Sequence, residues 1–160
     1  MNIKIIDFVK KLEGTKLCAY KDSGGVWTIG CGHTEGVKKG DCITQLEANK
    51  FLATDLTLFN NAVKDLCGNR INEEQSIALT SFAFNVGINA FANSTMLKMI
   101  QRNENPALEF LKWTMVNHKF NKGLRNRRLE EMRMFLSNGN SNLQPLSFFD
   151  NSVVQKILGE

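Results

Sequence analysis

Two carboxylates near the N-terminus, Glu13 and Asp22, have the residue types and surroundings for acid–base chemistry. Glu13 follows an amphipathic helical pattern over residues 3–12 and precedes Gly14, so it is expected at the end of a helix. The negative end of the helix dipole disfavours a charged carboxylate, and Glu13 therefore favours its protonated form unless a cation pairs with it. Asp22 begins the sequence D-S-G-G, which is typical of a turn exposed to water, and is expected to be ionised.

This pair of carboxylates suits the hydrolysis of a glycosidic bond. That reaction needs one carboxylic acid that donates a proton to the leaving oxygen, and a second, ionised carboxylate that acts as nucleophile or activates water. Thr28 adds a hydroxyl group in a β-prone sequence shortly after Asp22. The structural alternatives are an ordinary helix-terminal residue for Glu13, a turn-forming residue for Asp22 and a strand residue for Thr28.

The segment that carries these residues differs from the rest of the chain, because its helical period stops and glycine becomes frequent. Short β-prone pieces separated by turn signals predict a small antiparallel sheet with strands at 16–21, 26–29 and 31–34. Thr44 and Glu47 then form a capping-box pattern that opens a long helix ending near residue 66. That helix is long enough to link a small lobe to a larger one.

Helical patterns dominate the remaining sequence, and they are expected at 73–85, 95–101, 106–115, 124–136 and 152–158. The first of these is apolar on most sides, which predicts a central buried helix. The expected fold is α+β and mostly α, in one domain spanning 1-160 with a cleft between two lobes. Its parts are a small β lobe at about 14-43, a linking helix at about 44-67, and a helical lobe at about 68-160 that includes helix 3-12.

Net charge, apolar runs and cysteine spacing limit the kinds of protein that this sequence can encode. The 160 residues carry a net charge of +4, which favours an anionic partner without identifying it. No apolar run reaches the length of a transmembrane helix, and the N-terminus lacks the apolar core of a signal peptide, so a chain made in the cytosol is expected. The four cysteines are Cys18, Cys31, Cys42 and Cys67, and their spacing is not that of a zinc site. Reduced thiols are expected in the cytosol, although an even number of cysteines also allows disulfides.

The order of motifs resembles that of the phage-type lysozymes, glycoside hydrolase family 24, the T4-like endolysins. The resemblance begins with Glu13, Asp22 and Thr28, the last of them inside W-T-I-G-C-G-H-T. It continues with S-F-A-F-N-V-G at 81–87 and G-L-R-N-R-R-L-E-E at 123–131, and it covers about residues 4–139.

The resemblance implies a muramidase, a lysozyme-type glycoside hydrolase that cleaves the β-1,4 bond between N-acetylmuramic acid and N-acetylglucosamine in peptidoglycan for host lysis. It implies Glu13 as general acid, Asp22 as the carboxylate that activates or positions water, and Thr28 as the hydroxyl that orders this water. It also implies inversion at the anomeric carbon, for which the two carboxyl groups should stand roughly 6.5–9.5 Å apart. No metal and no cofactor are expected.

Three further residues receive roles from the same resemblance or from their position. Arg127, or its neighbour Arg128, is expected to supply the cation that pairs with Glu13. Asn85 is a candidate for hydrogen-bonding a sugar, although it also suits a helix C-cap. His33 is a candidate substrate-binding residue, with a structural role in the small lobe as the alternative.

The expected partner is the glycan strand of peptidoglycan, bound by a monomer. The enzyme would wait in the cytoplasm of the host bacterium and reach the periplasm once a holin opens the inner membrane. Nucleic acid is not expected, because acidic residues interrupt the basic run 119–133 and no aromatic residues alternate with it. Stable membrane insertion is not expected, because no apolar run is long enough for a transmembrane helix. The competing functions are a catalytically silent peptidoglycan-binding protein, a lytic transglycosylase, and membrane killing by the basic helix.

Overall fold

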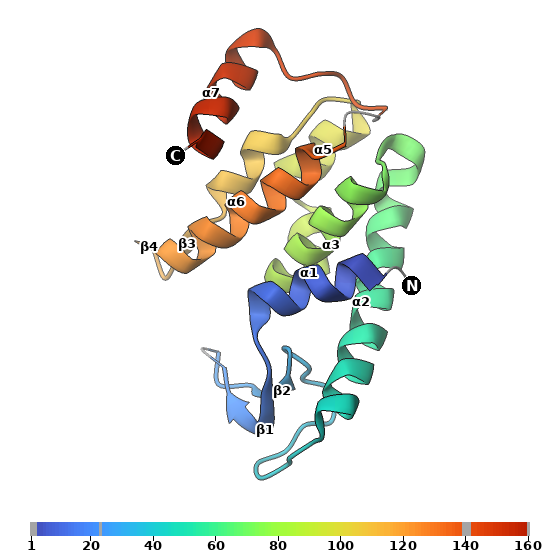
Figure 1. The fold of residues 1–160 in the computed structure, drawn as a ribbon, viewed down its shortest axis with the longest axis vertical. Coiled ribbons are helices and arrows are strands. Elements are labelled where there is room, and N and C mark those ends of the chain that lie inside the picture. The colour runs from blue at the N-terminus through green and yellow to red at the C-terminus, as the bar shows by residue number, and fades with distance from the viewer. Residues whose placement is uncertain (1–2, 23, 139–141, 160) are drawn as a thin grey trace. The chain divides into compact units, whose positions relative to one another are not determined.

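The computed structural model describes residues 3–22, 24–138 and 142–159. The chain divides into two compact units, Met1–Phe59 and Asn60–Glu160. The boundary falls inside the long helix α2 (Gln45–Cys67), and each unit is described by itself below (Figure 1). The chain is mostly helical with little β-structure, which confirms the expected fold class. Among the described residues, no helix combines the length and the apolar content that crossing a lipid bilayer requires.

The first unit begins with helix α1 (Ile3–Glu13), which leads into strands β1 (Lys16–Lys21) and β2 (Trp27–Gly30) (Figure 1). Gly14 ends α1 with a φ of +70°, in the left-handed region that glycine adopts without strain. Its N–H donates to the carbonyl of Lys10 at 3.2 Å, which is the hydrogen bond of a helix cap. The predicted helix end at Glu13 is therefore confirmed.

β1 and β2 pair antiparallel, with Tyr20 opposite Thr28 and Lys21 opposite Trp27. The predicted third strand at 31–34 is wrong. The chain turns instead, and His33 forms a single bridge back to Ile29 through a pair of backbone hydrogen bonds of 2.8 and 3.0 Å. The physical reason lies in Gly30 and Gly32, whose positive φ values of 65° and 101° interrupt an extended backbone.

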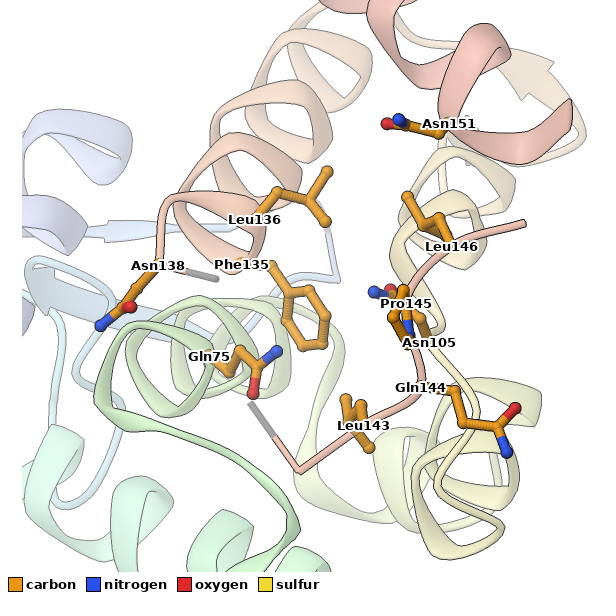
Figure 2. Close-up of a pocket in the computed structure, with 10 residues that line it drawn as sticks. All are labelled: Gln75, Asn105, Phe135, Leu136, Asn138, Leu143, Gln144, Pro145, Leu146 and Asn151. Atoms are coloured by element: carbon orange, nitrogen blue, oxygen red, sulfur yellow. The ribbon is translucent and has the colours of Figure 1, made fainter. Parts of the chain in front are cut away.

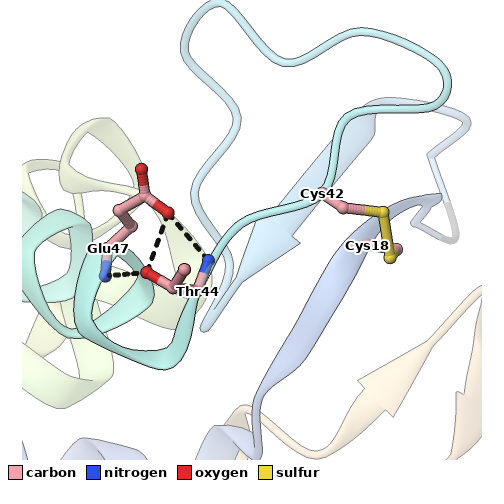
Figure 3. The surroundings of a disulfide bond; sticks show 4 residues. All are labelled: Cys18, Cys42, Thr44 and Glu47. Carbon is pink, nitrogen blue, oxygen red and sulfur yellow. Dashed lines mark hydrogen bonds between the residues drawn. A yellow bond between two sulfur atoms is a disulfide. The ribbon is translucent and has the colours of Figure 1, made fainter.

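A disulfide joins Cys18 of β1 to Cys42, in the segment that precedes α2 (Figure 3). The same two residues form an antiparallel bridge, which brings their Cα atoms to 4.1 Å. The expectation of reduced thiols is therefore wrong for this pair, because it relied on the cellular compartment and not on backbone pairing. Cys31 and Cys67 remain thiols and are buried. Figure 3 also shows the capping box that opens α2, in which Thr44 and Glu47 exchange hydrogen bonds as predicted.

Loss of the disulfide is expected to destabilise the first unit by about 3 kcal/mol, because the bond closes a loop whose ends lie 24 residues apart. Both cysteines are exposed, so a reductant can reach the bond. Urea unfolding with and without reductant would measure the difference. A Cys18→Ser/Cys42→Ser variant is the control, because its midpoint should match that of the reduced protein and should not respond to reductant. Equal midpoints for the oxidised and reduced protein would contradict the prediction.

The second unit is built around helix α3 (Glu73–Val86), whose residues 75–83 are all buried, as the sequence predicted. Asn72 caps this helix together with Gln75, and Gly87 ends it. Phe82 of α3 makes edge-on contacts with Phe91, Phe110 and Trp113, at ring-centroid distances of 6.3, 5.6 and 5.3 Å. The elements around α3 are η1 (Gly68–Arg70), α4 (Ile88–Ala92), α5 (Thr95–Gln101), η2 (Ala107–Lys112), α6 (Lys122–Leu136) and α7 (Phe148–Gly159).

Two predictions for the second unit are corrected. The segment 106–115 is not an α-helix but the short 3₁₀ helix η2, followed by a hairpin of β3 (Met115–Val116) and β4 (Lys119–Phe120). Its turn residues Asn117 and His118 have φ values of 48° and 61°, the left-handed backbone of a two-residue hairpin turn. The last helix, α7, begins earlier than predicted, and the short helix α4 was not predicted.

Candidate functional site

Glu13 is the last residue of α1, and its side chain is half-buried. The cap at Gly14 ends the helix there, and the next residue, Thr15, is joined to Cys31 by a hydrogen bond of 3.2 Å between the hydroxyl and the thiol. Cys31 follows β2 directly and is buried. The backbone on the C-terminal side of Glu13 is therefore tied to the sheet, which fixes the point from which its side chain extends.

Asp22 lies exposed in the turn between β1 and β2, where the sequence predicted it. Its Oδ1 accepts hydrogen bonds from the backbone N–H groups of Gly24, at 2.8 Å, and Val26, at 2.9 Å. A Cβ atom at Gly24 would approach this oxygen to 3.3 Å, so glycine gives the turn room to close. Oδ2 makes no hydrogen bond to any residue that the structure describes. Asp22 is thus a turn-forming residue that still offers one carboxylate oxygen to a ligand or water.

Thr28 lies in β2 and is only 3% exposed. Its hydroxyl donates to the carbonyl of Val26 at 3.0 Å. Because a hydroxyl carries one proton, Thr28 can only accept a hydrogen bond from any further partner. Thr28 can therefore order a water molecule by accepting a hydrogen bond from it.

Tyr20 is a neighbour of all three candidate catalytic residues, and sequence analysis missed it. Burial raises the pKa of its phenol, and the negative charges of Glu13 and Asp22 raise the pKa further. Both carboxylates therefore act on the same side chain, and the sheet register places Tyr20 opposite Thr28. Lys16 lies over the Tyr20 ring, 3.9 Å from its centroid. The available signal was the position of Tyr20 near the end of a predicted strand, two residues before Asp22.

His33 is held on two sides by helix α2. Its Nδ1 lies 2.8 Å from a carboxylate oxygen of Asp55, and its ring stacks on Phe51 with a centroid distance of 4.4 Å. These contacts support the structural role that the sequence left open. His33 also lines a pocket of about 440 Å³ together with Ile29 and Ile43, so its role toward a substrate stays a prediction.

The second unit contains a buried network of polar side chains between α3 and α6. Glu131 is its centre, with 0% exposure. Oε1 of Glu131 accepts from the Ser81 hydroxyl at 2.7 Å and from Nε of Arg127 at 3.0 Å, and Oε2 pairs with Arg128. Arg128, also at 0% exposure, donates in addition to Oδ1 of Asn85. Burial raises the pKa of Glu131, and the two guanidinium groups act in the opposite direction.

The two arginines that the sequence left as alternatives both pair with Glu131, and their further partners differ. Arg128 fixes Asn85, while Arg127 reaches the Ser81 carbonyl at 3.1 Å. The pairing of Arg127 with Glu13 and the contact of Asn85 with a sugar stay predictions. Glu131 was missed, although its spacing of four and three residues from Arg127 and Arg128 is that of helical ion pairs.

Comparisons with known proteins identify the relatives of this chain. The model of the phage lysozyme family matches residues 10–131. The chain is 36% identical over 135 residues to the endolysin of Acyrthosiphon pisum secondary endosymbiont phage 1, a match that covers 81% of this chain and 92% of that protein. It is 38% identical over 136 residues to the endolysin of Salmonella phage P22, with the same shares of 81% and 92%.

Among solved structures, the muramidase domain of SpmX from Asticaccaulis excentricus is similar, with a TM-score of 0.78 and 31% identity. That match covers 86% of this chain and 97% of the domain. The range that the family model matches includes every candidate site residue, from Glu13 to Arg127. The carboxylate pair, the sheet that presents it and the matched range lead to one conclusion: the chain belongs to the phage lysozyme family.

Proposed function

We propose that this member of the phage lysozyme family hydrolyses the β-1,4 bond between N-acetylmuramic acid and N-acetylglucosamine in bacterial peptidoglycan, with inversion. Its family makes it a lysozyme-type glycoside hydrolase, an endolysin that acts on the cell wall. The observation that supports the mechanism is the unequal exposure of the two carboxylates in the first unit. Glu13 is half-buried at a helix end, and Asp22 is exposed with one oxygen left for water.

The proposed reaction assigns one proton movement to each carboxylate. Glu13 gives its proton to the glycosidic oxygen as the bond from this oxygen to the anomeric carbon breaks. A water molecule attacks the anomeric carbon from the opposite face and passes a proton to Oδ2 of Asp22. Thr28 accepts a hydrogen bond from this water and so orients it. Arg127 is proposed as the cation for Glu13, and Asn85 and His33 as groups that contact the sugar.

The proposed setting follows from the same activity. The protein would act as a monomer that stays in the host cytoplasm until a holin gives it access to peptidoglycan in the periplasm. Its net charge of +4 supports approach to an anionic cell wall.

Mass spectrometry of peptidoglycan digested by the protein would test this function. Hydrolysis is expected to leave reducing muramic acid ends. Anhydro-muramic ends would show a lytic transglycosylase instead, and intact glycan with retained protein would show a wall-binding protein without catalysis. Proton NMR of the first product should detect the α anomer, because inversion changes the configuration of a β bond. A β anomer formed first would overturn the role given to Asp22.

A further inference from the structure

The second unit has a pocket of about 390 Å³ that the proposed reaction does not use (Figure 2). Its walls come from the start of α3, the segment before η2, the end of α6 and the segment 143–146 that leads to α7. Among the described residues that line it, five carry carboxamides, five are apolar and none is charged. The backbone N–H of Gln144 donates to the carbonyl of Asn103 at 2.7 Å, which fixes the segment 143–146 as one wall.

Gln75 presents a hydrogen-bond donor to this pocket although it is only 2% exposed. Its Oε1 accepts from the backbone N–H of Asn72 at 3.0 Å, within the capping box of α3. Because a backbone N–H can only donate, the atom facing it must be the oxygen, so the orientation of the amide is determined. The Nε2 group of Gln75 therefore remains available as a donor, and it has no hydrogen-bond partner in the part of the chain that the structure describes.

Asn105 repeats this arrangement on another wall. Its Oδ1 accepts from the backbone N–H of Ala107 at 3.1 Å, so its Nδ2 group is the unused one. Asn105 is half-buried, and its amide nitrogen likewise makes no hydrogen bond within the described ranges. Two donors with fixed orientation therefore belong to one pocket, and each is held by a helix start that would form whether or not a ligand bound.

Five of the described residues that line the pocket are apolar. Leu136 and Leu146 are half-buried and Pro145 is exposed, while Phe135 lies beneath them with 0% exposure. A phosphate or a metal ion finds no opposite charge here, so a neutral ligand is favoured. The ligand should carry oxygen acceptors for the two amide nitrogens and a small apolar group for the leucines. An N-acetylated amino sugar has both, in the carbonyl and the methyl of its acetamido group.

We infer that this pocket is an accessory saccharide site that binds one N-acetylated sugar unit of the glycan, an identity that rests on the proposed function. Its volume lies within the range of small-molecule sites, roughly 300–1,000 Å³. Binding here would hold the protein on the polymer between cleavage events, because a second contact on the same strand raises the local concentration of the reacting bond.

NMR titration with N-acetylglucosamine tests this inference, with the side-chain amide signals of Gln75 and Asn105 as the readout. The Glu13→Gln variant is used, so that the result does not depend on hydrolysis. Saturable shifts of both signals are expected, and glucose, which lacks the acetamido group, should bind at least tenfold more weakly.

Gln75→Glu is the decisive variant, because Glu also suits this capping-box position and keeps the acceptor while it removes the donor. We expect at least tenfold weaker binding. Gln101→Glu makes the same change on α5, outside the pocket, and should leave binding unchanged. Asn105→Asp removes the second donor and serves as the test if Gln75→Glu does not fold.

Unmoved signals, or equal affinity in Gln75→Glu and Asn105→Asp, would overturn the inference even if peptidoglycan is hydrolysed as proposed. Binding with the expected losses in a protein that cleaves nothing would support the site while the proposed function fails.

Discussion

Glu13→Gln should lower the rate of peptidoglycan hydrolysis by roughly a factor of 10²–10⁴, because glutamine cannot donate a proton to the leaving oxygen. The substitution keeps the size of the side chain at the end of α1 and leaves the cap at Gly14 in place. Turbidity loss of Gram-negative cells with a permeabilised outer membrane would measure the rate.

Asp7→Asn is a suitable control for this experiment, since it makes the same chemical change at an exposed residue of the same helix. It should lyse cells at the rate of the unchanged protein. Thermal unfolding of both variants would establish that they are folded. Lysis by a folded Glu13→Gln protein at the original rate would remove Glu13 from the mechanism.

Glu131→Gln should destabilise the second unit by about 3–5 kcal/mol, because it removes the charge of a buried carboxylate that pairs with two buried guanidinium groups. Arg128 and Glu131 have no exposed surface, and Arg127 is only 7% exposed, so water cannot replace the lost charge. The melting temperature should fall by at least about 6 °C for a chain of this size.

The neighbouring residue supplies the matched control. Glu130 pairs with Arg133 at 2.8 Å, but the two side chains are 34% and 43% exposed. Surface pairs of this kind contribute about 0–1 kcal/mol, so Glu130→Gln should leave the melting temperature nearly unchanged. Similar losses in the two variants would show that the buried network adds nothing beyond an ordinary surface pair.

The parts of the fold that could be predicted depend on local chemistry. Gly14, the capping box of Thr44 and Glu47, and Gly87 mark helix boundaries through contacts within a few residues, and each boundary is found where the sequence predicted it. The hairpin at 115–120 was missed because no glycine or proline marks its turn, whose left-handed residues are Asn117 and His118.

The residues of the candidate site divide in the same way, into those that local sequence predicts and those that depend on tertiary contacts. Glu13, Asp22 and Thr28 could be singled out because a helix end, a turn and a strand are each visible in short sequence windows. Tyr20 gains its importance from the register of β1 and β2, and Glu131 from partners on α3, 50 residues away at Ser81. The Cys18–Cys42 bond depends in the same way on a pairing across 24 residues. Such contacts follow from tertiary structure and leave no periodic pattern in the sequence.

The turn at Asp22 has a consequence for the entropy of catalysis. A carboxylate on a free side chain samples several rotamers, and holding one of them has a cost each time a substrate binds. Here two backbone N–H groups hold Oδ1, so the direction of Oδ2 is set by the main chain of the hairpin. The base is therefore preorganised when the protein folds, and a water molecule meets an acceptor that does not have to reorient before it takes a proton.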